Sequence, residues 1–182
     1  MYNFIHIPKV AGSAFYKLIE GHSDKISYSG HTRAIVSLGS LAFVRNPYDR
    51  LVSAYFYLMT SRALEKNLPL YKKIITTYKD FKDFVLNIEN DNLMEKILHL
   101  KPMRHWICDD NNKIIVEKIF KIEDIDSINT FMAEVGIEKK MSDIKRNTSK
   151  HKNYKKYMDA EVIDEINKLY SLDFELFNYK KL

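Results

Sequence analysis

The sequence predicts a single α/β domain, residues 1–182, in which helices cover both faces of a mainly parallel β-sheet. Its length of 182 residues falls in the usual range for one domain. Hydrophobic residues make up 46% of the chain and aromatic residues 13%, which is enough to fill a core and excludes a disordered chain. Strand-like apolar runs alternate with amphipathic runs, and no repeat or linker interrupts them, which favours a three-layer arrangement.

Two strand-to-helix turns organise the first third of the chain. The first follows an apolar run that Pro8 ends, and Gly12 and Ser13 then begin a helix. The second follows another apolar run, with Asn46 suited to the N-cap and Pro47 to the first helical position. The expected elements are strands 2–7 and 41–44 and helices 12–20 and 48–64.

The rest of the chain shows the same alternation. Asn111 and Asn112 predict a turn between a strand that ends near Cys108 and a further strand. Asp126 is expected to cap a helix that Gly136 ends. The other expected elements are helices 81–88 and 93–100, strand 113–122 and helix 162–170.

Net charge and cysteine content indicate which ligands and which cellular compartment suit this chain. A formal net charge of +5 suits an anionic ligand, but acidic and basic residues are mixed, unlike the basic arm of a nucleic-acid-binding protein. Cys108 is the only cysteine, which excludes an intrachain disulfide and favours a reducing, cytoplasmic location. The sequence has neither a secretory signal nor an apolar run of the ~18 residues that a membrane helix needs.

The turn from Pro8 to Ser13 has the composition of an anion cradle. The start of a helix offers N–H groups and a partial positive charge. Gly12 would allow a ligand to approach closely, Lys9 adds a full charge and Ser13 adds a hydroxyl. The alternative is an ordinary turn with a solvent-exposed lysine. The order of residues differs from a Walker A loop, in which the lysine directly follows a glycine, and this disfavours an ATP-dependent kinase.

The second turn places Arg45 at a strand end, beside the start of a helix. Ser53 lies about two helical turns further on. A planar guanidinium and a hydroxyl suit a terminal phosphate monoester. Arg50 lies one turn from the helix start and points either to the same ligand or to an acidic partner within the fold.

Two segments, HIPKVAGS (residues 6–13) and FVRNPYDRLVSAY (residues 43–55), resemble the signature segments of PAPS-dependent sulfotransferases, closest to the carbohydrate sulfotransferases typical of the Golgi. The resemblance continues in FKIEDI (residues 120–125), in residues 147–149 and in YSLDFELFNY (residues 170–179), so it spans the whole domain. It implies a fold like that of P-loop kinases. It also implies in-line sulfuryl transfer from PAPS (3′-phosphoadenosine 5′-phosphosulfate) without a metal, because the leaving group is already good.

The resemblance assigns the first segment to the 5′-phosphosulfate of the donor and the second to its 3′-phosphate. Lys9 is expected at the leaving-group oxygen, where positive charge matters most in the transition state. His31, which follows Gly30 in a polar turn, is expected to be the base. The cofactor-binding residues that the resemblance implies are Pro8, Lys9, Gly12, Ser13, Arg45, Ser53, Arg146, Thr148 and Ser149.

Several of these assignments have plainer alternatives. His31 would otherwise be a surface histidine, and residues 144–152 would otherwise be a solvated basic loop. His6 is more consistent with a buried structural residue beside the cradle, while His105 and Glu123 are rival bases, Glu123 being better suited to closing a strand. Trp106 either stacks on adenine or a sugar or belongs to the core.

The sequence therefore predicts a sulfotransferase whose donor is PAPS, whose product is PAP and whose acceptor is a hydroxyl, expected on a carbohydrate. One alternative is a nucleotide or small-molecule kinase. Another is a non-catalytic basic module that binds sulfated glycans or nucleic acid, with steep salt dependence. Residues 60–100 match nothing in the family pattern, so the acceptor is the least defined part of this prediction.

Overall fold

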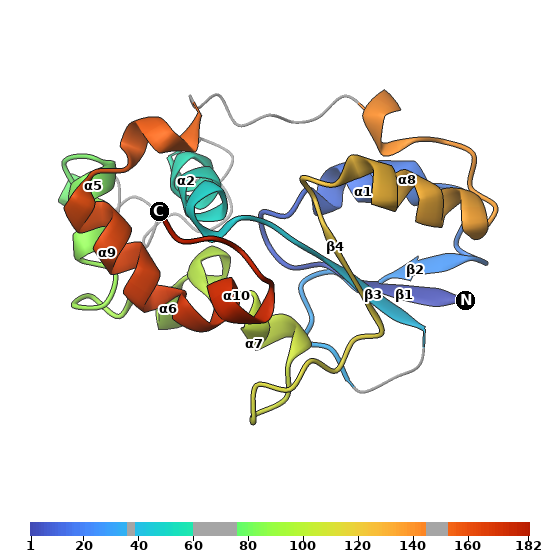
Figure 1. Ribbon diagram of the computed structural model, residues 1–182, viewed down its shortest axis with the longest axis horizontal. Helices are drawn as coiled ribbons and strands as arrows, with labels where there is room; N and C mark the ends of the chain where they lie inside the picture. Colours follow the sequence, from blue (N-terminus) through green and yellow to red (C-terminus); the bar gives the residue numbers. More distant parts are fainter. Residues whose placement is uncertain (36–38, 60–75, 145–152) are drawn as a thin grey trace. The chain divides into compact units, whose positions relative to one another are not determined.

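The computed structural model describes residues 1–35, 39–59, 76–144 and 153–182, which form two compact units. The first unit takes in Met1–Arg45 and Pro102–Asn147, and the second takes in Asn46–Lys101 and Thr148–Leu182 (Figure 1). Each unit is thus made of two separate stretches of the chain.

A four-stranded parallel sheet forms the centre of the first unit. Its strands are β1 (Tyr2–Ile5), β2 (Ile26–Tyr28), β3 (Ser40–Val44) and β4 (Lys118–Lys121), in the order β2-β1-β3-β4. Phe4 lies opposite both Tyr28 and Leu41, and Phe43 lies opposite Phe120. The expected α/β class with a parallel sheet is confirmed.

Helices flank this sheet. In Figure 1, α1 (Gly12–Ile19) and α8 (Ile125–Glu134) both lie on one side of the strands. The ring of Phe15 on α1 lies 4.4 Å from that of Phe4 and 4.6 Å from that of Phe43, measured between centroids. On α8, the ring of Phe131 packs at 5.1 Å from that of Phe120. The short helix α7 (Arg104–Ile107) lies on the other side of the strands.

The second unit is helical. Its core joins buried residues of several helices, among them Leu51, Phe84 and Val162. Its elements are α2 (Pro47–Leu58), α5 (Phe81–Leu86), α6 (Leu93–Lys96), the 3₁₀ helices η1 (Leu98–Leu100) and η3 (Tyr154–Tyr157), α9 (Ala160–Leu169) and α10 (Ser171–Leu176). The first unit contains a further 3₁₀ helix, η2 (Met141–Asp143).

The N-cap predicted from the sequence is correct for α2 and wrong for α8. The Asn46 side chain accepts hydrogen bonds from the backbone N–H groups of the first turn of α2, and Pro47 is its first residue, as predicted. The predicted cap of α8, Asp126, is wrong, because Asp124 accepts from the Ser127 N–H and Asp126 lies inside the first turn. Gly136, with φ of 75°, follows the helix end as expected.

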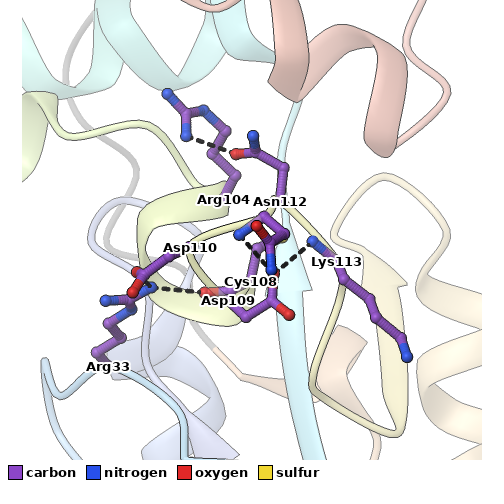
Figure 2. Close-up of polar contacts among 8 residues, drawn as sticks. Arg33, Arg104, Cys108, Asp109, Asp110, Asn112 and Lys113 are labelled. Carbon is purple, nitrogen blue, oxygen red and sulfur yellow. Dashed lines mark hydrogen bonds and ion pairs between the residues drawn. The ribbon is translucent and has the colours of Figure 1, made fainter.

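The expected strand before Cys108 is wrong, because these residues form α7. The turn at Asn111 and Asn112 is confirmed: Cys108 and Ile114 form an isolated antiparallel bridge around it. Figure 2 shows how this bend is held, with the Asp109 carboxylate accepting from the backbone N–H groups of Asn111 (2.9 Å) and Lys113 (2.8 Å). Strand β4 is shorter than expected, and β2 was not expected.

Helix α2 ends at Leu58 with Met59 as its C-cap, so the unbroken helix expected to reach residue 64 is wrong at its end. Residues 60–64 lie outside the described residues. The expected helix 93–100 is divided into α6 and η1. Within the described ranges, no helix has both the length and the apolar character needed to cross a membrane.

Candidate active site at the carboxyl ends of the strands

All four strands of the sheet end at one edge, and the candidate residues of the first unit follow those ends. The turn from Pro8 to Ser13 follows β1, His31 follows β2, Arg45 follows β3 and Glu123 follows β4. Ligands of parallel α/β sheets bind at this edge, since the strand-to-helix turns gather there. The sheet thus brings residues far apart in the sequence to one edge.

The turn after β1 has an unusual backbone. Lys9 and Ala11 both have positive φ, 69° and 64°, in the left-handed region that residues with a Cβ rarely occupy. Ala11 is the N-cap of α1 and makes no side-chain cap, so the first N–H groups of this helix are not satisfied by a capping side chain. Ser13 is exposed in the first turn, Lys9 is half-buried and Pro8 is buried. This backbone suits the binding of an anion at the start of α1.

Arg45 contacts this turn directly. Its Nη1 donates a hydrogen bond to the carbonyl oxygen of Lys9 at 3.1 Å. Its backbone N–H points to the sulfur of Met103 at 3.4 Å. The structure therefore brings together Lys9 and Arg45, which the sequence had placed in two separate turns.

Gly12 lies directly against a buried histidine ring. A Cβ at this position would lie 1.9 Å from Cδ2 and from Nε2 of the His6 ring. The space above Gly12 is therefore occupied by His6, and the glycine is needed to accommodate that ring. His6 is 8% exposed, so the expectation of a buried residue beside the cradle is confirmed.

His31 is oriented by the backbone of His6. The Nδ1 atom of His31 lies 2.9 Å from the carbonyl oxygen of His6. Because a carbonyl oxygen only accepts, Nδ1 carries the proton, and the basic lone pair of the neutral ring is on Nε2. The two histidine rings also pack against each other, with centroids 4.2 Å apart and planes inclined by 33°. The His31 side chain is exposed.

Tyr28, at the end of β2, holds the His6 ring from the other side. Its hydroxyl hydrogen-bonds Nδ1 of His6. Burial, and secondly the nearby Tyr16, raise the pKa of Tyr28 above its ordinary value of 10.0. The phenol is thus protonated at neutral pH and acts as the donor. The sequence around Tyr28 carries no signal of this role beyond its place two residues before the Gly30–His31 turn.

The structure also places the other candidate residues of the first unit, Trp106, His105 and Glu123. Trp106 is 2% exposed, so the core interpretation holds and its faces do not present a stacking surface. His105 packs edge-on against Trp106, with ring centroids 5.2 Å apart. Glu123 lies in the turn between β4 and the cap of α8, which agrees with its expected place at a strand end.

The other predicted ligands lie outside the first unit or outside the described residues. Ser53 is on α2 in the second unit and is 3% exposed. Arg50 is also buried there, and its Nη2 donates to the carbonyl oxygens of Lys101 (2.8 Å) and His99 (3.4 Å), which is a structural role. Arg146, Thr148 and Ser149 lie outside the described residues.

The same edge offers cations and hydrogen-bond donors. In the part of the chain that the structure describes, no group of three or more His, Cys, Asp or Glu residues is placed to hold a metal ion. The arrangement instead provides an ammonium, a guanidinium, the start of a helix and an oriented imidazole, a set that suits an anionic substrate with a proton to remove.

A family model described as the sulfotransferase family matches residues 3–180. The match takes in both structural units and all four turns described above. The comparison with curated proteins found no match. The comparison with solved structures found none either.

Proposed function

Because this chain belongs to the sulfotransferase family, we propose that it transfers a sulfuryl group from PAPS to an acceptor hydroxyl, and that the acceptor is a carbohydrate. Family membership by itself supports sulfuryl transfer in general. The identity of the donor is supported by the two turns at Lys9 and Arg45. The carbohydrate acceptor rests on the likeness of the same two segments to the carbohydrate sulfotransferases.

The hydrogen bond from Arg45 Nη1 to the Lys9 carbonyl is the observation that carries the proposal. It links the segment proposed to hold the 5′-phosphosulfate to the segment proposed to hold the 3′-phosphate. A guanidinium presents its N–H donors in a planar fork that matches the oxygens of a phosphate, which is why Arg45 is proposed for the 3′-phosphate. In this proposal Pro8, Lys9, Gly12 and Ser13 bind the 5′-phosphosulfate and Arg45 binds the 3′-phosphate. Ser53 remains a proposed ligand of the 3′-phosphate on the likeness of its segment alone.

The proposed reaction is an in-line displacement at sulfur. The acceptor oxygen forms a bond to sulfur while the bond from sulfur to the bridging phosphate oxygen breaks, which releases PAP. Nε2 of His31 takes the proton of the acceptor hydroxyl. Lys9 stabilises the negative charge that develops on the bridging oxygen. Arg146, Thr148 and Ser149 remain proposed contacts of the nucleotide.

Calorimetric titration with PAP, ADP and ATP tests the donor assignment. We expect PAP to bind more tightly than ADP, because only PAP carries the 3′-phosphate that Arg45 is proposed to bind. Arg45→Ala should weaken PAP binding by about 10- to 100-fold, the usual loss of a hydrogen bond to a charged group. Lys25→Ala is the matched control, since Lys25 precedes β2 at the opposite edge of the same sheet and should leave PAP binding unchanged.

Two results would contradict the proposal. Equal or tighter binding of ATP with Mg²⁺ would favour a kinase. Binding of sulfated polysaccharide with steep salt dependence and no binding of PAP would favour a non-catalytic module.

A further inference from the structure

We infer that Arg33 is a positioning residue for His31, which it holds in place through the backbone of residues 29–35. This inference rests on the proposed function, in which His31 is the base. Residues 29–35, called the strap below, follow β2 and form neither helix nor strand. A segment of this kind keeps its shape only through contacts with its surroundings, because it has no internal ladder of hydrogen bonds.

The first half of the strap is attached to β1. The Ser29 N–H donates to the carbonyl of Phe4 at 3.1 Å. The carbonyl of Gly30 accepts from the His6 N–H at 3.2 Å. His31 then adds the bond from its own Nδ1 to the His6 carbonyl, at 2.9 Å.

The second half is attached to α7 and the bend after it. Nη2 of Arg33 donates to the Cys108 carbonyl at 3.0 Å and to the Asp110 carboxylate at 2.7 Å, as Figure 2 shows for the ion pair. The Ala34 N–H donates to the Trp106 carbonyl at 2.7 Å. His31 therefore lies between two attachments, one to each neighbouring part of the unit.

The bend that receives Arg33 is itself well fixed. Asp109 closes it through two backbone N–H groups, and Nη1 of Arg104 donates to the Asn112 side chain at 2.7 Å (Figure 2). Cys108 forms the β-bridge at its base and is buried. Arg33 thus ties the strap to a rigid support.

The position of Arg33 matters because the His31 ring is exposed. Water competes for a hydrogen bond at an exposed imidazole, so the bond to the His6 carbonyl holds the ring only while the backbone beneath it stays in place. The Arg33 side chain is 45% exposed, so its removal opens no cavity in the core. Its loss should therefore free the strap without unfolding the unit.

The first test is kinetic and uses Arg33→Ala with Lys25→Ala as the matched control, since the Lys25 ammonium also donates to a backbone carbonyl of the same unit, that of Gly136. Turnover is measured with radiolabelled PAPS and a panel of unsulfated polysaccharides, and with water as acceptor. We expect kcat of Arg33→Ala to fall by about 10- to 100-fold through misplacement of the base. The affinity for PAP should be unchanged, and Tm should fall by no more than about 3 °C.

A double variant separates positioning from a general structural role. In the His31→Ala background, Arg33→Ala should cause no further loss of turnover, because its effect passes through His31. Arg33→Lys, which keeps one donor, should restore part of the turnover. An Arg33→Ala enzyme with normal turnover, or one whose loss persists undiminished without His31, would overturn the inference.

The second test needs no acceptor. A long-range nitrogen–proton NMR spectrum shows which imidazole nitrogen carries the proton, and His31→Ala identifies the His31 signals. We expect the Nδ1–H form in the wild type and a mixture of both forms in Arg33→Ala. An unchanged spectrum in Arg33→Ala would contradict the inference. If the wild type neither binds PAP nor transfers sulfate, the proposed function fails, and this spectrum still decides whether Arg33 positions the ring.

Discussion

His6 supports the site through both its ring and its backbone. The His6 ring fills the space above Gly12, and its Nδ1 accepts a hydrogen bond from the Tyr28 hydroxyl. The His6 carbonyl oxygen accepts from Nδ1 of His31 and so fixes the tautomer of that ring. One buried residue thus links the start of α1 to the proposed base. Because the ring and Gly12 occupy adjoining space, their effects on stability should be strongly coupled.

We expect Gly12→Ala to lower the free energy of unfolding by about 1–3 kcal/mol, because the new Cβ displaces a buried, hydrogen-bonded ring. In the His6→Ala background the clash is gone. There the same substitution should be neutral or should stabilise by up to about 1 kcal/mol, since alanine favours helices more than glycine does. Urea unfolding of the four proteins measures this coupling.

Gly21→Ala serves as the control for this cycle. Gly21 has φ of +87° and no atom within 4 Å of an added Cβ, so its substitution adds strain that does not involve His6. Its cost should be the same in both backgrounds. An equal cost of Gly12→Ala with and without His6 would show that the ring is not what selects glycine at position 12.

Residue roles were predictable where they depend on local sequence. Lys9 follows an apolar strand, so its place at the carboxyl edge could be predicted. His31 follows β2, which was not expected, and only the resemblance marked it. Arg33 could not be identified, because its partner Cys108 lies 75 residues away in the sequence. The need for glycine at position 12 could not be predicted either, because it depends on the direction of the His6 side chain.

At the scale of the elements, local signals predicted the start of α2 and the end of α8 but not the cap of α8. Asn46 and Pro47 fixed the start of α2 to the residue. The stretch before Cys108 was misread, because a short apolar run is compatible with a strand or a helix and only tertiary packing decides. β2 was not predicted because three residues are too few to show a strand pattern. Its extended conformation is stabilised by the hydrogen bonds of its pairing with β1.

The cap of α9 predicts a dependence of stability on pH. The backbone N–H of Val162, and secondly the Lys82 ammonium, lower the pKa of Asp159 from its ordinary value of 3.8. The folded state therefore favours the ionised carboxylate. This contribution is fully present above pH 3.8 and is lost as the pH falls through the lower pKa of the folded state.

We expect Asp159→Asn, which keeps a capping oxygen but does not titrate, to show a smaller fall in Tm on acidification than the wild type. Thermal unfolding monitored by circular dichroism across the acidic range measures the difference. Asp164→Asn, on the same helix but away from its cap, should follow the wild type. If Tm of Asp159→Asn depended on pH as that of the wild type does, the charge of the Asp159 carboxylate would not contribute to stability.

At the scale of the whole molecule, Cys108 reports on the opening of the first unit. It is the only cysteine of the chain and is 1% exposed. A thiol reagent can reach it only when this part of the structure opens. The candidate site lies on the same unit, so a ligand bound there should protect the thiol by mass action.

We expect PAP at 100 times its Kd to slow the labelling of Cys108 by about 100-fold when labelling follows unfolding of the site. ADP at the same concentration is the control, and Arg45→Ala should lose the protection in proportion to its weaker binding. Tight binding of PAP without protection would show instead that Cys108 becomes exposed by a local opening that leaves the donor site intact.

Strands β3 and β4 are neighbours in the sheet, yet the chain leaves β3 at Val44 and enters β4 only at Lys118. The whole first stretch of the second unit, Asn46–Lys101, lies between them in the sequence. The entropy of closing a loop grows only with the logarithm of its length, so doubling this excursion costs about 0.6 kcal/mol. The segment between these strands can therefore change in length during evolution at little cost in stability. The pairing of β3 with β1, which places Arg45 beside the turn after β1, can stay the same.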